Sequence, residues 1–169
     1  FKEILLILLL RKDKEMNLTE EKYNRYALVR EMMETPDIFR NFKPSVTQRF
    51  LKRIKSKKGL LLTGEGSSRI FPAKRAITAM RRAGSYFPVI TEGSTQAEEY
   101  PLNNYAVFAA SNSGQTKEVV RLFYTLEKRN HDALFGLTAN NGTKLEELAT
   151  ETHILSCGKE EAVAATKSV

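Results

Sequence analysis

The chain has 169 residues, enough for one domain with a substantial core. Apolar residues make up 41% and charged residues 28%, which excludes a collagen-like fibre, a disordered tail and a multi-span membrane protein. Lys and Arg outnumber Asp and Glu by 27 to 20, so the net charge of +7 favours anionic partners. A single cysteine excludes a disulfide framework, and two histidines leave little for a metal cluster.

The N-terminal segment, residues 1–15, contains an unbroken apolar run from Ile4 to Leu10. A helix that spans a bilayer needs about 20 apolar residues, so this run is too short. Charged residues at 11–15 stand where a signal peptide has its small-residue cleavage site. We expect an accessory segment that packs on the domain or on a second chain, no membrane partner, and a cytoplasmic protein.

Residues 16–58 are predicted to form N-terminal helices. Thr19 is a suitable N-cap for the first helix. Thr35 precedes a proline, and a residue in that position avoids the helical region, so the helix is predicted to end there. Pro44 suits the first turn of the next helix, whose apolar face continues towards Gly59.

Residues 59–169 form the third part, in which short apolar runs alternate with helical patterns. Continuous apolar runs are typical of strands buried on both faces, and their alternation with helices indicates a parallel sheet. We predict an α/β fold: a three-layer αβα sandwich with a five-stranded, doubly wound (flavodoxin-like or Rossmann-like) parallel sheet. A last helix is predicted from Glu160 to Val169. The predicted strands are 60–63, 87–90, 105–110, 133–138 and 153–156.

Ligands of doubly wound sheets bind at the carboxyl ends of the strands. One loop at that end offers the hydroxyl groups of Ser111, Ser113 and Thr116 around Gly114. It opens a helix, whose first amide groups lack partners and attract anions. The loop therefore predicts a phosphate site; the alternative is that one serine only caps the helix.

An earlier loop, residues 64–69, is an incomplete dinucleotide fingerprint, because Arg69 replaces the third glycine. We disfavour a nicotinamide dinucleotide and expect neither an organic cofactor nor a metal. Ser67 and Ser68 are interpreted as donors to a second polar part of the same ligand. Glu65 is predicted to point away from a bound phosphate.

Three glycine- and hydroxyl-rich segments together resemble the sugar isomerase (SIS) domain family. The similarity is nearest to the isomerising half of glucosamine-6-phosphate synthase and to related ketose/aldose-phosphate isomerases and deaminases. It covers residues 59–169 and, more loosely, residues 31–36. The segments are Gly64-Glu65-Gly66-Ser67-Ser68, Ser111-Asn112-Ser113-Gly114-Gln115-Thr116-Lys117-Glu118 and Gly158-Lys159-Glu160-Glu161-Ala162-Val163-Ala164-Ala165-Thr166-Lys167.

The resemblance implies a phosphosugar-binding site. Ser111, Ser113 and Thr116 match residues that hold the phosphate, and Ser68 matches a serine that contacts the ligand. Asn112 stands where the synthase has glutamine, and a serine usual at position 165 is alanine here. With the residues of the loops above, the predicted substrate site comprises Ser67, Ser68, Ser111, Asn112, Ser113, Gly114, Thr116, Val163 and Ala165.

The resemblance also implies an activity: an aldose–ketose isomerase, or a deaminase or aminotransferase, acting on a hexose or amino-hexose 6-phosphate through an enediol. In the relatives a second, similar domain supplies the catalytic carboxylate and histidine, and no such domain precedes the end at Val169. A second domain or another copy, as in a homodimer, is therefore expected to complete the site. The catalytic residues are unknown, with Glu160 and Glu161 as candidates.

Two alternatives stay open at this point. Glu160 and Glu161 could instead be first-turn acids that complement a helix dipole, and this interpretation is preferred. The domain could also be a non-catalytic sensor that binds a phosphosugar and reports it to a partner.

Residues 43–82 carry twelve basic residues and a single acid, Glu65. A nucleic-acid partner is disfavoured, because the charges fall between apolar positions as on solvated helix faces, and no RNA-binding aromatic signature is present. Three further residues are given structural roles: Cys157 as a small buried side chain, His131 as a solvated loop residue and His153 as part of a strand.

Overall fold

The computed structural model describes residue 18 and residues 20–168. The expectations for residues 1–15 and for Thr19 as a helix cap lie outside this range. Within it, no helix is both long enough and apolar enough to cross a membrane.

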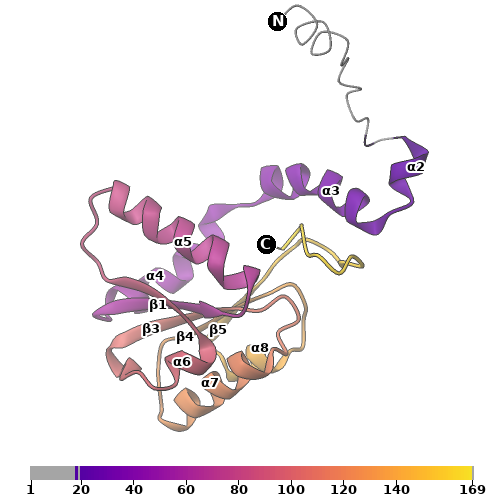
Figure 1. Cartoon of the computed structure of the whole chain (residues 1–169). Coiled ribbons are helices and arrows are strands. Elements are labelled where there is room, and N and C mark those ends of the chain that lie inside the picture. Colours follow the sequence, from indigo (N-terminus) through magenta and orange to yellow (C-terminus); the bar gives the residue numbers. More distant parts are fainter. Residues whose placement is uncertain (1–17, 19, 169) are drawn as a thin grey trace, which may run out of the picture.

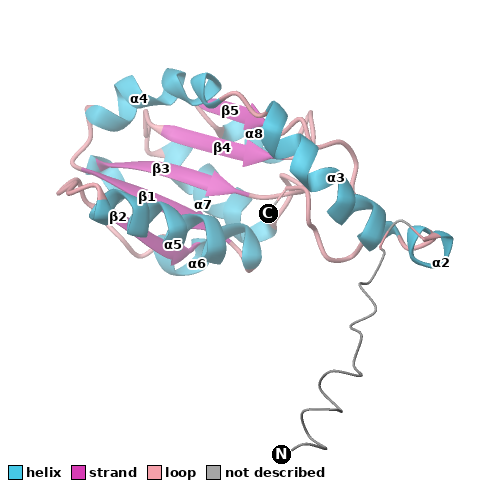
Figure 2. Ribbon diagram, turned by 90° about the horizontal axis from the view of Figure 1, so that it is seen from above, coloured by secondary structure: helices cyan, strands magenta, loops and turns pink. Residues whose placement is uncertain are grey.

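All five strands of the sheet are parallel, as predicted, and they lie in the order β2-β1-β3-β4-β5 (Figure 2). β1 lies between β2 and β3, so that Leu60 pairs with Val89 on one side and Ala106 on the other. The chain leaves β1 towards one edge of the sheet and leaves β3 towards the other edge. The strands are β1 (Gly59–Gly64), β2 (Val89–Gly93), β3 (Tyr105–Ala110), β4 (Leu134–Thr138) and β5 (Glu151–Ile154).

Helices cover both faces of the sheet, which confirms the predicted three-layer sandwich (Figure 1). α4 (Gln48–Lys55) and α5 (Ser67–Arg82) lie on one face. The other face carries α6 (Ser94–Ala97), α7 (Lys117–Lys128) and α8 (Lys144–Leu148), and a short 3-10 turn, η2 (Leu102–Asn104), leads into β3.

Each face has its own core. α7 buries Val119, Leu122, Phe123 and Leu126, a spacing that forms one apolar stripe of a helix, against Leu61, Val107, Leu134 and Leu145. On the other face Phe50 of α4 packs against Phe135, with ring centroids 5.2 Å apart. These two clusters hold the strand ends, and the loops that follow them, in fixed positions.

The N-terminal helices have other boundaries than predicted. After α2 (Glu21–Asn24), α3 (Ala27–Asn41) continues through Pro36, so the expected end at Thr35 is wrong. A proline inside a helix removes one backbone hydrogen bond. The Thr35 hydroxyl donates to the carbonyl of Glu31 at 3.1 Å at this point. Pro44 opens a 3-10 turn, η1 (Pro44–Thr47), directly before α4.

The predicted helix from residue 160 is also wrong within the described residues. Residues 158–168, here named the C-terminal strap, form no regular secondary structure. The strap lies beside α3 (Figure 1) and is attached to it by side-chain hydrogen bonds. Its backbone amides therefore need acceptors other than those of a helix.

Candidate functional site

The predicted ligand loops lie at the carboxyl ends of β1 and β3 (Figure 2). These adjacent strands continue towards opposite edges of the sheet, which makes their junction the topological switch point of the fold. Open α/β sheets bind ligands in the crevice outside this point. The structure therefore brings loops 64–68 and 111–116 together.

Hydrogen bonds within loop 111–116 hold the hydroxyl groups of Ser111, Ser113 and Thr116 in place. The Ser111 and Thr116 hydroxyls lie 2.7 Å apart, and the Gly114 amide donates to Ser111 Oγ at 3.1 Å. The Gln115 amide donates to Ser113 Oγ at 3.1 Å. Ser111 is buried and Ser113 exposed, so Ser111 shapes the loop while the hydroxyl of Ser113 is open to a ligand.

Gly114 fixes the loop against the start of α8. Its φ of +62° suits glycine, and a Cβ there would lie 2.4 Å from Thr143 Oγ1. Its carbonyl accepts a hydrogen bond from the Leu145 amide at 3.0 Å. The loop is held rigidly in front of α7.

The first loop contributes Ser67, exposed at the start of α5, and the half-buried Ser68. Glu65 turns away as predicted, because its Oε1 accepts a hydrogen bond from the amide of Ser94 at 2.9 Å. Ser68, Ser111 and Asn112 line one small cavity of about 70 Å³ with Ser168 of the strap. Three predicted residues therefore share a cavity at the switch point.

Glu160 anchors the strap next to that cavity. Its Oε1 accepts hydrogen bonds from the amides of Thr166 at 2.7 Å and Lys167 at 2.8 Å. Its Oε2 accepts from Asn112 Nδ2 at 2.8 Å and from the Ser168 hydroxyl. Asn112 Nδ2 also donates to Ser168 Oγ at 2.5 Å. The strap is thus tied to the phosphate loop through Asn112.

These bonds determine the ionisation of Glu160. Burial raises the pKa of its carboxyl group, but the hydrogen bonds from Ser168, from the amides of Lys167 and Thr166, and from Asn112 outweigh burial and lower the pKa overall. A carboxylate with four donors is a weak proton acceptor. The preferred interpretation of Glu160 and Glu161 as helix acids is wrong, since no helix forms here.

The lowered pKa of Glu160 predicts how the strap responds to pH. A carboxyl group with a depressed folded-state pKa stabilises its contacts above the unfolded-state value of 4.5 and loses that contribution as pH falls through the folded-state value. We expect the Thr166 and Lys167 amides to lose protection from hydrogen exchange below that range. In Glu160→Gln these amides should be weakly protected at every pH; an acid transition retained in this variant would contradict the assignment.

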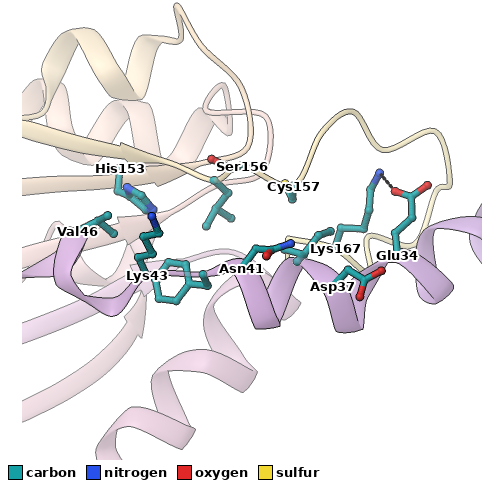
Figure 3. A pocket seen from close by; sticks show the side chains of 12 residues that line it. Glu34, Asp37, Asn41, Lys43, Val46, His153, Ser156, Cys157 and Lys167 are labelled. Atoms are coloured by element: carbon teal, nitrogen blue, oxygen red, sulfur yellow. Dashed lines mark hydrogen bonds and ion pairs between the residues drawn. The ribbon is translucent and has the colours of Figure 1, made fainter.

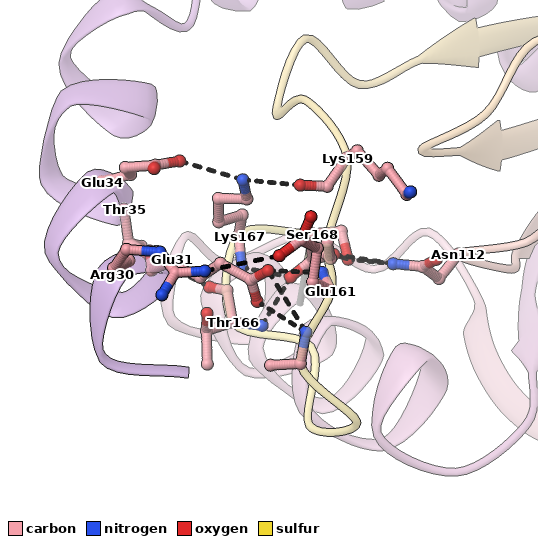
Figure 4. A network of polar contacts seen from close by, with 12 residues as sticks. Arg30, Glu31, Glu34, Thr35, Asn112, Lys159, Glu161, Thr166, Lys167 and Ser168 are labelled. Atoms are coloured by element: carbon pink, nitrogen blue, oxygen red, sulfur yellow. Dashed lines mark hydrogen bonds and ion pairs between the residues drawn. The ribbon is translucent and has the colours of Figure 1, made fainter. Parts of the chain in front are cut away.

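α3 holds the other side of the strap (Figure 4). Glu31 is only 4% exposed and accepts hydrogen bonds from the amides of Glu161 at 2.5 Å and Ala162 at 3.2 Å. Lys167 Nζ donates to Glu34 Oε2 at 2.9 Å. The exposed carboxylate of Glu161 lies 3.4 Å from Arg30. Sequence reasoning missed Glu31, because nothing in the sequence distinguishes it from Glu34 and Asp37, the other acids of α3.

The structure does not bring every predicted residue to the switch point. The Val163 side chain is fully exposed and Ala165 is half-buried, and neither lines the cavity with Ser68 and Ser111. Their contact with a sugar stays a prediction.

A larger cavity of about 460 Å³ lies elsewhere, between α3 and the end of β5 (Figure 3). Its walls include Phe42 and Leu155, with Lys43 and His153 at one end and Lys167 at the other. None of the predicted site residues lines it. We assign the candidate site to the smaller cavity, because the hydroxyl loops and the helix start lie there.

Cys157, His153 and His131 lie outside the candidate site. Cys157 is buried as predicted, and burial, then the charge of Glu160, raises the pKa of its thiol. His153 lies on β5, and burial lowers its pKa. His131 is half-buried rather than solvated: its Nε2 lies 3.1 Å from the Leu102 carbonyl, and burial lowers its pKa.

Most basic residues of segment 43–82 lie on α4 and α5, and Lys43, Lys57 and Lys58 lie outside these helices. Lys52, Lys55, Lys74 and Arg75 are exposed, as predicted for solvated helix faces.

Neither a family model nor a curated protein matches the chain. Solved structures do. The C-terminal domain of glucosamine-fructose-6-phosphate aminotransferase from Francisella tularensis matches with TM-score 0.65 and 16% identity, over 89% of this chain and 45% of that one. The Vibrio vulnificus NanR protein, complexed with ManNAc-6P, matches with TM-score 0.60 and 18% identity, over 89% and 56%.

A third match is the sugar isomerase domain of the RpiR transcription factor from Sphaerobacter thermophilus, with TM-score 0.56 and 13% identity over 76% of this chain and 72% of that one. The chain has the fold of the sugar isomerase (SIS) domains, and its hydroxyl-rich loops lie at the switch point of that fold. It spans about half the length of the first two structures that it matches.

Proposed function

We propose that this phosphosugar isomerase-like domain binds a sugar phosphate, a hexose or amino-hexose 6-phosphate, at the switch point between β1 and β3. The observation that carries the proposal is loop 111–116, which gathers three hydroxyls directly in front of α7. Helix N-termini and clustered donors bind phosphate groups. The ManNAc-6P complex of the Vibrio vulnificus protein supports the same class of ligand.

The strap moves to admit this ligand. The cavity of about 70 Å³ is far smaller than a small-molecule pocket of roughly 300–1,000 Å³. Glu160 and Ser168 lie against Asn112 and occupy the space next to the phosphate loop. Breaking these two contacts lets the strap swing outward while loop 111–116 keeps its shape.

We propose further that the domain is part of an isomerase, deaminase or aminotransferase that moves a proton through an enediol. That step needs a general base near the sugar. When the contact between Glu160 Oε2 and Asn112 breaks, Oε1 still accepts hydrogen bonds from the amides of Thr166 and Lys167. Glu161 is exposed beside Arg30, so we assign the base to a second domain or another copy. The similarity to the aminotransferase domain supports this candidate.

A non-catalytic sensor is the second candidate, supported by the similarity to the transcription-factor domain. Exchange of the C2 proton with solvent, in the full-length protein, separates the two. Exchange supports an enzyme, and tight binding without exchange supports a sensor.

We place the protein in the cytoplasm as a homodimer or as one of two paired domains. α3 supports a partner chain, because Leu28, Met32, Met33 and Phe39 are exposed along it. Large exposed apolar side chains in one region mark an interaction surface.

Substitution of the two accessible loop hydroxyls tests phosphate binding. Each of Ser113→Ala and Thr116→Ala should weaken binding of a hexose 6-phosphate by roughly 1.5–3 kcal/mol, because each removes a hydrogen bond to a charged group. Calorimetric titration gives the affinity, with inorganic phosphate and the free sugar as reference ligands. Thr78→Ala, an exposed threonine on α5, is the matched control and should bind normally. Unchanged affinity in both loop variants would contradict the proposal that loop 111–116 binds the phosphate.

A further inference from the structure

Two carboxylates satisfy four backbone amides of the strap. The strap is not helical, so its N–H groups cannot bond along the chain as they do in a helix. Glu160, within the strap, takes the amides of Thr166 and Lys167. Glu31, on α3, takes those of Glu161 and Ala162 from a position 130 residues earlier in the chain.

Glu31 is the single buried residue of α3, whereas its neighbours Met32 and Met33 are exposed. Burial of a carboxylate is unfavourable unless hydrogen bonds compensate it. Here two amides do so, and the Thr35 hydroxyl, one turn later, adds a bond to the Thr166 carbonyl at 3.2 Å. The face of α3 that carries Glu31 is therefore built around the strap (Figure 4).

A bound ligand would affect the attachment of the strap to Asn112 differently from its attachment to Glu31. Asn112 belongs to the phosphate loop, so its bonds to Glu160 and Ser168 change when the site fills. Glu31 contacts neither hydroxyl loop, and its two bonds can persist while the strap swings outward. Its attachment then limits where residues 163–165, which directly follow, can lie.

We propose that Glu31 is a positioning residue for the sugar end of the site. The inference rests on the proposed function. Glu31 fixes the amides at 161 and 162 and thereby restrains the backbone that leads to Val163 and Ala165, the residues predicted to contact the sugar. It does not touch the phosphate. Its loss should weaken recognition of the sugar and leave recognition of the phosphate intact.

The test is the affinity of fructose 6-phosphate and of inorganic phosphate for Glu31→Gln, measured by calorimetric titration of the full chain. The glutamine keeps the size of the side chain and removes the charge. We expect about tenfold weaker binding of fructose 6-phosphate, the effect of losing about 1.4 kcal/mol of interaction. Binding of inorganic phosphate should equal that of the unsubstituted protein.

Two further variants separate positioning from a general loss of structure. Asp37→Asn neutralises another acid of α3, whose bond is to Arg40 of the same helix, and should bind both ligands normally. Thr35→Val removes the bond to Thr166 and should weaken binding of fructose 6-phosphate in the same direction, by a smaller factor. It serves where Glu31→Gln fails to fold. Hydrogen exchange at the amides of Glu161 and Ala162 should accelerate in Glu31→Gln alone.

Each outcome has one meaning. A selective loss of fructose 6-phosphate affinity supports the inference. Unchanged affinity of Glu31→Gln for both ligands, or an equal loss of affinity for both in the folded variant, overturns it while the proposed function stands. If the unsubstituted protein binds neither ligand, the proposed function fails, and the inference fails with it.

Discussion

Replacement of Gly114 by alanine is expected to destabilise the domain by about 2–5 kcal/mol and to abolish phosphate binding. The φ of +62° costs a residue with a Cβ about 1–2 kcal/mol, and forcing extra atoms into a packed region costs about 1–3 kcal/mol more. The new Cβ would lie 2.4 Å from Thr143 Oγ1 and 2.5 Å from Thr143 Cβ. Chemical denaturation measures the free energy of unfolding.

Moving Thr143 away from the new Cβ would also cost free energy. It is buried, and its side chain caps α8 by accepting a hydrogen bond from the Glu146 amide. The loop must therefore yield, which separates the Ser111 and Thr116 hydroxyls. Gly142→Ala is the control, because Gly142 has a φ of +65° but open space around its Cβ position. It should cost only the backbone strain, about 1–2 kcal/mol, and should bind phosphate. Equal losses in both variants would contradict the role assigned to Thr143.

The sheet was predictable because each strand has an apolar sequence pattern of its own. Runs such as residues 105–110 are continuously apolar since both faces of β3 are covered, and the observed strand has these bounds. The stripe of Val119, Leu122, Phe123 and Leu126 is similarly local, because its spacing places these side chains on one face of a helix. The order of the strands was not predicted, because alternation with helices leaves more than one order open for a doubly wound sheet.

α3 and the strap were mispredicted because their hydrogen bonds are formed at long range. Thr35 was expected to end its helix, but its hydroxyl shares its one proton between the carbonyls of Glu31 and Thr166, so the strap supports α3 next to Pro36. The amides of the strap are satisfied by Glu31, which no local pattern connects to Glu161. A helix prediction assumes that these amides bond to carbonyls four residues earlier, and here carboxylates replace those carbonyls.

The candidate site was predictable in composition and less so in arrangement. The hydroxyls of loop 111–116 follow from residue types and from the position after β3. That Ser111 is buried and only Ser113 fully open depends on how Gly114 packs on Thr143, which the sequence does not display. For the same reason Glu160 was expected at a helix start, whereas it joins the phosphate loop to the strap.

The core beneath these loops should be sensitive to a single aromatic side chain. Phe135→Ala is expected to lower the free energy of unfolding by about 3–5 kcal/mol, the usual range for deleting a buried phenylalanine. Phe135 is fully buried in β4, with ring centroids 5.2 Å from Phe50 and 6.2 Å from Phe108. Because Phe50 is the single buried residue of α4, the cavity would also loosen that helix.

The same substitution should also disturb the candidate site, because β4 leads directly to it. The strand ends at Thr138, whose hydroxyl donates to the Asn112 carbonyl at 3.0 Å and so supports the phosphate loop. Phe71 on α5 is 67% exposed, so Phe71→Ala makes the same chemical change without a cavity and should alter stability by no more than about 0.5 kcal/mol. Urea denaturation followed by circular dichroism compares the two. If Phe135→Ala were as stable as Phe71→Ala, the cluster of Phe50, Phe108 and Phe135 would not be the core that fixes β4 and, with it, the position of Asn112.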